Sequence, residues 1–400
     1  MSGDGYIDNT AWDEALESNP DVVRVAGVPS PEGRPTTEVL HRPGELIVDR
    51  DVYAARRADH RGARELLDRS GARLVEEGDR AASAERLGLR LLEVDRDADL
   101  VGIVREGRRF APQGIGLVTV LTACPQRHGG CAPPQPVATS VDIPGSDDAG
   151  AGITVGVLDT GIFESAPFPF EAGSEDIEPV AEDPPGTFGP GVGHGTMVAG
   201  VIARYAPGAR LVIRKVLDTP LGVADELEIA QAIADLPHDV DIVNASFGGF
   251  DADDTPLLAL ERELDRLPRD TLVVAAAGNE GLRRPEFMAA FKRVVGVASV
   301  EWRDLGFQLP EYTNRGYWVD CSAEGTDVES TFLAGSPSSG APEFTGHARC
   351  SGTSFAAPKV TAAAATIAAR YGIGVRLAAQ LLTDDRARPV LTEGGTVVVP

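Results

Sequence analysis

Short runs of hydrophobic residues alternate with amphipathic segments through most of the chain after residue 150. The uninterrupted runs predict buried strands at 153–158, 211–216, 241–245, 272–277, 294–298 and 318–321. Segments in which hydrophobic residues recur every three or four positions predict helices at 194–205, 223–236 and 255–267. Such strands, separated by helices, are typical of a mainly parallel sheet with helices on both faces. We therefore expect an α/β unit that binds ligands at the carboxyl ends of its strands.

A different pattern precedes residue 124. It predicts strands at 45–48, 72–76, 87–94 and 116–122, with helices at 53–70 and 98–110. The resulting order, βαββαβ, is the ferredoxin-like arrangement, a small α+β domain with two helices on one face of an antiparallel sheet.

Local composition suggests where these units begin and end. Residues 1–40 are acidic with few periodic hydrophobic positions, which predicts a loosely ordered leader. The ferredoxin-like domain is expected at 41–123. A stretch rich in Pro, Gly, Ser and Asp at 124–152 predicts a linker, and the α/β domain is expected at 153–400. A chain of 400 residues is long enough for one large and one small domain.

Charge and hydropathy narrow the range of partners. The chain has 37 basic and 61 acidic residues, a net charge of -24, which disfavours nucleic acid and anionic membrane surfaces. No apolar run approaches the roughly 20 residues that span a bilayer, and the first residues do not resemble a signal peptide. We therefore expect no membrane partner, and a cytoplasmic location is favoured.

Cysteines are too few to build a disulfide scaffold, since the chain has four. Cys124, His128 and Cys131 have a metal-like spacing, but no fourth ligand lies nearby in the sequence. Because structural zinc takes four ligands, we expect no zinc site there. Cys321 and Cys350 are left open as a pair or as two thiols.

A turn at 351–354 leads into an Ala-rich segment that predicts a helix over 356–370. Gly352 permits a tight turn, and Pro358 suits the first helical turn, where amide donors lack an intrahelical acceptor. Ser354 then lies near the positive end of the helix dipole, where free amides stabilise an oxyanion. The alternative is an ordinary N-cap, because serine is favoured at helix starts.

Three further polar residues follow strands or begin a helix of the α/β unit. Asp159 ends a hydrophobic strand, and Asn279 follows another, although both suit turns as well. His194 begins a predicted helix between two small glycines. Together with Ser354 they supply a carboxylate that orients a histidine, a base, an amide donor and a nucleophile. This is the set that acyl transfer requires.

The segments around these four residues resemble the four signature blocks of subtilisin-like serine peptidases, the peptidase S8 or subtilase family. The resemblance covers about residues 150–400, and the chain order Asp, His, Ser matches the family. The blocks are Val155-Gly156-Val157-Leu158-Asp159-Thr160-Gly161, Gly193-His194-Gly195-Thr196-Met197-Val198-Ala199-Gly200, Val274-Ala275-Ala276-Ala277-Gly278-Asn279-Glu280-Gly281 and Ser351-Gly352-Thr353-Ser354-Phe355-Ala356-Ala357-Pro358.

The resemblance implies a serine endopeptidase that hydrolyses peptide bonds of polypeptide substrates through an acyl-enzyme. It implies Ser354 as nucleophile, His194 as base and then acid, Asp159 as orienter and Asn279 as oxyanion donor, with the Ser354 amide as second donor. The family's primary specificity pocket matches two segments, whose residues are Ser246, Phe247, Gly248, Ala276, Ala277 and Gly278. No cofactor is required. Family members often bind structural calcium, but the acidic loop at 171–183 lacks the ligand spacing, so we expect a solvated loop and no metal site.

Many members of the family carry a βαββαβ propeptide, which the N-terminal domain resembles in topology. By that likeness it is an intramolecular inhibitor and folding aid, and the chain is a zymogen that cuts itself in the linker between Cys124 and Gly152. The alternative is a masked binding protein in which this domain is a permanent lid.

Other peptidase classes fit less well. Asp159-Thr160-Gly161 also matches the catalytic triplet of aspartic peptidases, but those enzymes need two such carboxylates and the chain has no second triplet. Sedolisin-type peptidases place Glu where His194 stands. The Gly-x-Ser-x-Gly elbow of α/β-hydrolases is absent.

Overall fold

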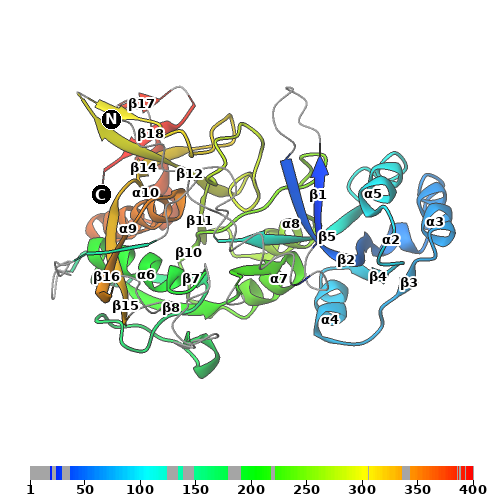
Figure 1. Cartoon of the computed structure of the whole chain (residues 1–400), viewed down its shortest axis with the longest axis horizontal. Helices are drawn as coiled ribbons and strands as arrows, with labels where there is room; N and C mark the ends of the chain where they lie inside the picture. The colour runs from blue at the N-terminus through cyan, green and yellow to red at the C-terminus, as the bar shows by residue number, and fades with distance from the viewer. Residues whose placement is uncertain are drawn as a thin grey trace.

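A computed structural model of the chain describes residues 19, 24–28, 37–123, 134–137, 148–178, 191–217, 221–304, 306–335, 343–384, 386, 389–391 and 393–399. These residues form a small N-terminal sheet unit and a larger α/β unit, which lie side by side and are joined through a strand that runs from the first towards the second (Figure 1).

The N-terminal unit is a sheet with helices packed on it. Its elements are β1 (Arg24–Val28), β2 (Thr37–Asp49), α2 (Arg50–Tyr53), α3 (His60–Arg69), β3 (Arg73–Leu74), α4 (Asp79–Arg86), β4 (Leu89–Glu93), α5 (Leu100–Arg108) and β5 (Ile115–Thr122). The strands lie in the order β3-β4-β2-β5, each antiparallel to its neighbour, and β1 pairs with β2. The predicted strands and their antiparallel arrangement are therefore present.

Three details of this unit differ from the sequence prediction. The helix predicted at 53–70 is two helices, because the chain turns at Ala55, which has a φ of 48°. Helix α4 was not predicted, since it is short and mostly polar. The leader is not loosely ordered throughout, because Arg24–Val28 pairs antiparallel with the first residues of β2.

The larger unit is built on a nine-stranded sheet in the order β17-β18-β14-β12-β11-β10-β7-β8, with β13 paired to β12. From β8 to β18 neighbouring strands are parallel, which confirms the predicted α/β class. The strands of this sheet are β7 (Thr154–Asp159), β8 (Arg210–Lys215), β10 (Ile242–Ala245), β11 (Leu272–Ala276), β12 (Val294–Arg303), β13 (Gly306–Gln308), β14 (Cys321–Glu324), β17 (Val390–Leu391) and β18 (Gly395–Val398). Strand β9 (Val223–Asp225) belongs to the N-terminal sheet, where it pairs with β5.

Helices cover both faces of this sheet and bury its hydrophobic strands. They are α6 (His194–Tyr205), α7 (Glu226–Ala234), α8 (Leu258–Arg266), α9 (Thr353–Tyr371) and α10 (Val375–Thr383), with a short 3-10 turn at Ser174–Asp176. The core on one face includes residues of α6, α9 and α10, and the core on the other includes residues of α7 and α8. A hairpin of β15 (Val328–Gly335) and β16 (Phe344–Cys350) lies outside the main sheet, and β6 (Gln135–Pro136) pairs with β16.

Two predictions for the larger unit are wrong in detail. The helix predicted at 223–236 begins as strand β9, and α7 follows it; Asp225 ends the strand and caps the helix by accepting from the amides of Leu227 (2.9 Å) and Glu228 (3.1 Å). The strand predicted at 318–321 begins only at Cys321.

The N-terminal sheet is buried on both faces, which explains how the two units are held together. Leu46 and Val48 of β2 pack in the core of the N-terminal unit, whereas Ile47 between them packs in the core that contains α7 and α8. Alternate residues of a strand point to opposite faces. The open face of the small sheet is therefore covered by helices α7 and α8 of the larger unit.

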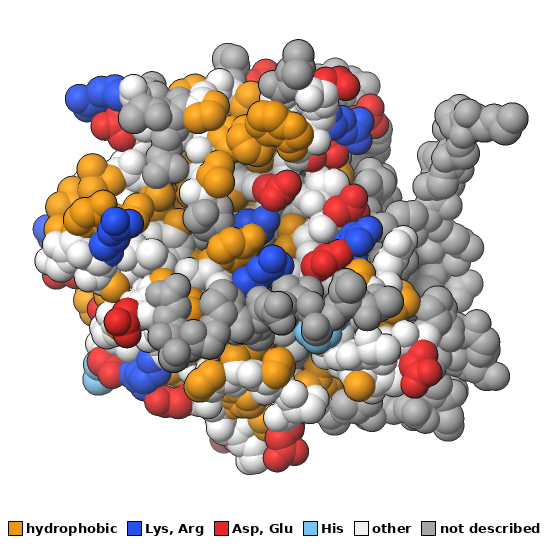
Figure 2. All heavy atoms as spheres, turned by 90° about the vertical axis from the view of Figure 1, so that its left-hand side faces the viewer, with side chains coloured by type: hydrophobic (Ala, Val, Ile, Leu, Met, Phe, Trp, Pro, Cys, Tyr) orange, Lys and Arg blue, Asp and Glu red, His pale blue; other side chains and the backbone are white. Residues whose placement is uncertain are grey.

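The surface on the side of the C-terminal elements is mixed. Figure 2 shows hydrophobic side chains there in several groups, separated by acidic and basic ones. The exposed large hydrophobic residues of the described chain are Phe110, Trp302, Tyr317, Tyr371, Leu377, Leu381, Val390 and Val399. Within the described residues, no helix has both the length and the apolar character needed to cross a bilayer.

Candidate active site

The carboxyl end of β7 and the first residue of α6 bring Asp159 and His194 together. Nδ1 of His194 and Oδ1 of Asp159 are 2.7 Å apart, with Asp159 0% and His194 8% exposed. An ionised carboxylate only accepts hydrogen bonds, so Nδ1–H donates and Nε2 is left as the basic atom of the neutral ring. Gly195 makes this approach possible, because a side chain there would collide with the carbonyl of Gly161.

The Asp159 carboxylate is held by its own turn. Its Oδ1 also accepts from the amide of Thr160 (2.8 Å), and the Thr160 hydroxyl accepts from the amide of Gly195 (3.0 Å). Its Oδ2 is buried without a hydrogen-bond partner among the described residues. These contacts fix the orientation of Asp159 towards α6.

Glu178 is a buried acid beside this pair that the sequence analysis missed. Its Oε1 accepts from the amide of Gly193 at 2.9 Å. Burial, together with the nearby charge of Asp159, raises the pKa of Glu178 to about 8, although the hydrogen bond from Gly193 and the charges of Lys215 and His194 lower it. An isolated acid in an irregular loop gives no sequence signal, so only the folded structure shows that Glu178 lies beside this pair.

Ser354 is the second residue of α9 and lies across the cleft. Its Oγ donates to the carbonyl of Ser246 at 3.2 Å. The N-cap of α9 is Gly352, which makes no side-chain capping bond, so the N-cap interpretation of Ser354 is not supported. The ring of His194 contacts Phe355, the next residue, with ring centroids 5.6 Å apart. His194 and the first turn of α9 are therefore neighbours.

Pro358 does not lie in the first helical turn, as the sequence predicted, but further inside α9. Proline has no N–H, so the carbonyl of Ser354, four residues earlier, loses its usual intrahelical donor. The hydroxyl of Ser246 donates to that carbonyl instead, at 3.0 Å. Because Pro358 cannot donate, the bond from Ser246 connects the start of α9 to the segment after β10.

Asn279 follows β11 and contacts the start of the same helix. Its Oδ1 accepts from the amide (2.8 Å) and the hydroxyl (3.0 Å) of Thr353. A backbone amide is always a donor, so the atom facing it is the amide oxygen and the NH2 group is left for other acceptors. The amide of Ser354 lies in the first turn, where no intrahelical acceptor exists.

A small pocket adjoins Ser354 and Asn279, and most of the predicted pocket residues line it. Its described lining consists of Thr122, Ala123, Ser246, Phe247, Gly248, Ala276, Gly278, Asn279, Glu286, Thr353 and Ser354. Ala277 is not among them, since its methyl group packs in the core. Glu286 was not predicted, because it lies in the loop after β11 and reaches the pocket only through the fold.

The N-terminal unit supplies two residues of this lining. Thr122 pairs with Gly248 through two backbone hydrogen bonds of 2.9 and 3.1 Å, and the amide of Ala123 donates to the carbonyl of Gly222 (3.1 Å). On its other side β5 pairs antiparallel with β9. The end of β5 therefore lies as an added strand between β9 and the pocket segment at Gly248.

Metal ligands do not gather among the residues that the structure describes, where no group of three or more His, Cys, Asp or Glu could hold an ion. In the acidic loop, Glu171 pairs with Arg210 and Asp176 with Arg214. Residues 179–183 of that loop, and Cys124, His128 and Cys131, lie outside the described residues. Cys321 and Cys350 are both buried, and no disulfide joins them.

The Asp159–His194 pair thus lies beside the first turn of the helix that carries Ser354, and Ser354 lines a pocket of the α/β unit. This is the arrangement on which one class of serine hydrolases is built. The chain belongs to the subtilase family, whose model matches residues 150–391.

Individual relatives agree with this assignment. A thermostable alkaline protease of Halalkalibacterium halodurans is 32% identical over 234 residues, which cover 56% of this chain and 58% of that protein. Subtilisin Savinase of Lederbergia lenta is 31% identical over 231 residues, which cover 54% of this chain and 77% of that protein. The chain thus spans little more than half of the alkaline protease.

A solved structure supports the fold. Fervidolysin from Fervidobacterium pennivorans, a keratinolytic enzyme related to subtilisin, superposes with a TM-score of 0.57 at 18% identity. The match covers 90% of this chain and 60% of fervidolysin, so it extends into the residues before 150.

Proposed function

We propose that this protein is a serine endopeptidase that hydrolyses peptide bonds through an acyl-enzyme. The observation that carries the proposal is the buried hydrogen bond between His194 and Asp159, next to the first turn of the helix that carries Ser354. Membership of the subtilase family supports it.

The chemistry follows from the donors and acceptors of the site. Ser354 Oγ turns from the Ser246 carbonyl to Nε2 of His194, gives up its proton and attacks the substrate carbonyl carbon. The NH2 group of Asn279 and the amide of Ser354 donate to the oxyanion that forms. His194 passes the proton to the leaving amine, and Asp159 stabilises the imidazolium meanwhile. A water molecule, activated by His194, then hydrolyses the ester.

The N-terminal unit is proposed as an intramolecular inhibitor. The end of β5 lies where a substrate strand would add to the segment at Gly248, since an extended peptide binds an exposed edge through backbone hydrogen bonds. A substrate therefore binds only after this segment leaves.

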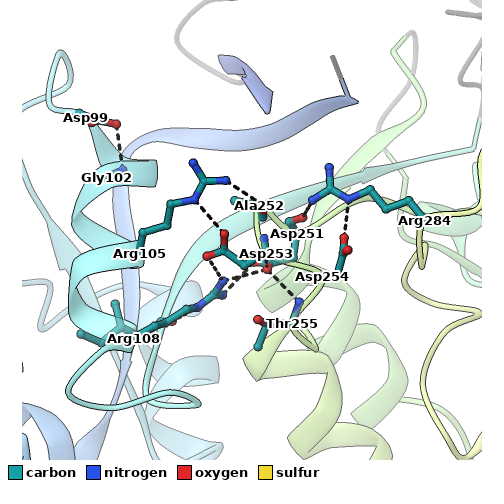
Figure 3. Close-up of polar contacts among 11 residues, drawn as sticks. Asp99, Gly102, Arg105, Arg108, Asp251, Ala252, Asp253, Asp254, Thr255 and Arg284 are labelled. Carbon is teal, nitrogen blue, oxygen red and sulfur yellow. Dashed lines mark hydrogen bonds and ion pairs between the residues drawn. The ribbon is translucent and has the colours of Figure 1, made fainter. Parts of the chain in front are cut away.

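Ion pairs between the two units also support this role. Arg42 and Arg80 both pair with the buried carboxylate of Asp225, at 2.9 Å each. Figure 3 shows Arg105 and Arg108 of α5 pointing towards the loop after β10, where they pair with Asp253 (2.8 Å) and Asp251 (2.8 Å).

We further propose that the chain is a zymogen, cut by its own active site in the linker between Cys124 and Gly152. Residues 124–133 and 138–147 of the linker lie outside the described residues. Mass spectrometry of purified wild-type protein and of Ser354→Ala tests the step. The expected result is a cut wild type and an intact variant, and equal masses for both would contradict it.

A fluorophosphonate probe tests the catalytic proposal. The probe phosphonylates an activated serine, so we expect labelling that Ser354→Ala abolishes and His194→Ala lowers on the order of a millionfold. His194→Ala with most of its reactivity would refute the mechanism. A chain that stays unlabelled even after proteolytic removal of its first 130 residues would favour the permanent lid.

A further inference from the structure

The pocket beside Ser354 contains a buried acid, Glu286, which is 2% exposed. Its carboxyl group lies between the two walls of the pocket. A side chain at Gly248 would collide with Oε1 of Glu286, and one at Gly278 would collide with Oε2. Two glycines therefore make room for this carboxyl group in the slot where a substrate side chain would enter.

A second acid, Glu280, lies next to Glu286 and shares a hydrogen-bond donor with it. Nδ2 of Asn314 donates to Oε2 of Glu286 (2.6 Å) and to Oε2 of Glu280 (2.8 Å). Burial, followed by the charge of Glu280 and a hydrogen bond with it, raises the pKa of Glu286 well above its ordinary value. When one of two carboxyl groups in contact ionises, the other keeps the shared proton, so the pair then holds a single negative charge.

No cation of the described chain neutralises that charge. The groups that shift the pKa of Glu286 are Glu280 and Asn314, and neither is basic. The two arginines nearest to Glu286 in the sequence are occupied elsewhere, since Arg283 pairs with Glu393 and Arg284 with Asp254. A buried charge without a counter-ion is unfavourable, and a cationic ligand removes that penalty.

We propose that Glu286 makes this pocket selective for a lysine or arginine side chain at the residue before the cleaved bond. The inference rests on the proposed peptidase function and adds the substrate class. The charged end of a lysine or arginine side chain that enters between the two backbone walls meets the carboxyl pair. A large apolar side chain meets the same carboxyl groups and offers them no hydrogen bond, so it is disfavoured.

Peptidyl diphenyl phosphonates that differ only in their last side chain test the proposal. The serine oxygen bonds to phosphorus and phenol leaves, so the rate of labelling reports pocket fit at Ser354. We compare lysine, phenylalanine and alanine probes on the full chain. The N-terminal strand blocks the cleft equally for all three, so ratios of second-order rate constants are unaffected by it.

The lysine probe should react about tenfold faster, or more, than the other two. Glu286→Gln keeps the shape of the side chain but removes its ionisable carboxyl group, so it should bring the ratio of the lysine rate constant to the other two near one. Glu311→Gln is the matched control, since it removes an exposed carboxylate in the segment that bonds to Gly281 and leaves the Arg284–Asp254 pair intact. It should keep the lysine preference.

Each outcome decides something. A wild type that prefers alanine or phenylalanine overturns the proposal, even if Glu286→Gln does not fold. A lysine preference that Glu286→Gln retains overturns the role of this residue. Labelling by the fluorophosphonate without lysine preference overturns the specificity alone, whereas no labelling by any probe, even after proteolytic removal of the first 130 residues, overturns the peptidase function as well.

Discussion

The hydroxyl of Ser246 donates to the carbonyl of Ser354 at 3.0 Å, and the hydroxyl of Ser354 donates back to the carbonyl of Ser246 at 3.2 Å. This reciprocal pair ties the wall of the pocket to the first turn of α9. It exists because Pro358 cannot supply the amide that would otherwise bond to Ser354.

Ser246→Ala should therefore lower the free energy of unfolding by about 1 kcal/mol or more, because it leaves a buried carbonyl without its donor. In a Pro358→Ala background the restored amide bonds to that carbonyl, so the same change should have a smaller effect. Urea denaturation of the four proteins in this cycle measures the difference. An equal loss in both backgrounds would contradict the link to Pro358.

Asn279→Ala should lower kcat/KM for a peptide substrate on the order of a hundredfold to a thousandfold, because one oxyanion donor is lost. It should also destabilise the protein, since the amide of Thr353 loses its acceptor. Thr353→Val is the control: it removes only the hydroxyl that contacts Asn279, so the rate should change less than about tenfold. Similar rates for wild type and Asn279→Ala would remove Asn279 from the mechanism.

Glu178 should make stability fall as pH rises. Its pKa is about 8 in the folded chain and has its ordinary value of 4.5 in the unfolded chain. Between these values the unfolded chain loses a proton that the folded chain keeps, so the free energy of unfolding decreases, by at most about 1.4 kcal/mol per pH unit. Below pH 4.5 the Glu178 carboxyl is protonated in both states and does not change stability with pH, and above about pH 8 its full destabilising effect is present.

Glu178→Gln should abolish that part of the slope and be relatively more stable at pH 8 than at pH 5. Unfolding measured at both pH values checks it. Burial also raises the pKa of Glu226 to about 8, so Glu226 gives wild type and Glu178→Gln the same dependence of stability on pH. The difference between the two proteins therefore isolates the effect of Glu178. Parallel stability curves would show that the Glu178 carboxyl ionises normally.

The two arginines of α5 should differ in how strongly they hold the N-terminal unit. The side chains of Arg108 and Asp251 are 10% and 1% exposed, whereas those of Arg105 and Asp253 are 43% and 32% exposed. Loss of one partner from a buried ion pair is strongly destabilising, because it leaves a buried charge without its counter-ion, whereas exposed ion pairs contribute little to stability. Arg108→Ala should therefore speed fluorophosphonate labelling more than about tenfold.

Arg105→Ala is the matched control in the same helix and should speed labelling less than about fivefold. Both variants are measured as full-length chains with Ser354 intact. Equal rates for both variants and wild type would mean that the buried pair does not control release of the N-terminal unit.

Much of the larger unit could be predicted from local patterns. Strands of a parallel sheet are hydrophobic over their whole length, and β7, β8, β10 and β11 were recognised on that basis within a residue or two. The positions of the three residues follow from these elements. Asp159 ends strand β7, Asn279 lies just beyond strand β11, and His194 begins helix α6. These ends meet at one edge of a parallel sheet, so the sequence predicted their proximity.

Other features depend on partners far away in the chain. Val223–Asp225 is strand rather than helix because it pairs with β5, about a hundred residues earlier. Pro358 lies inside α9 because Ser246 replaces the missing donor. Short-range periodicity contains no information about either partner.

By itself the sequence determined the α/β class, the family resemblance and the four candidate catalytic residues, since these depend on local periodicity and short motifs. Only the tertiary structure decided that Glu286 lines the pocket, that Glu178 lies beside Asp159 and that the end of β5 pairs with Gly248. Charge compensation and burial are sums over neighbours from the whole chain. They exist only once the chain has folded.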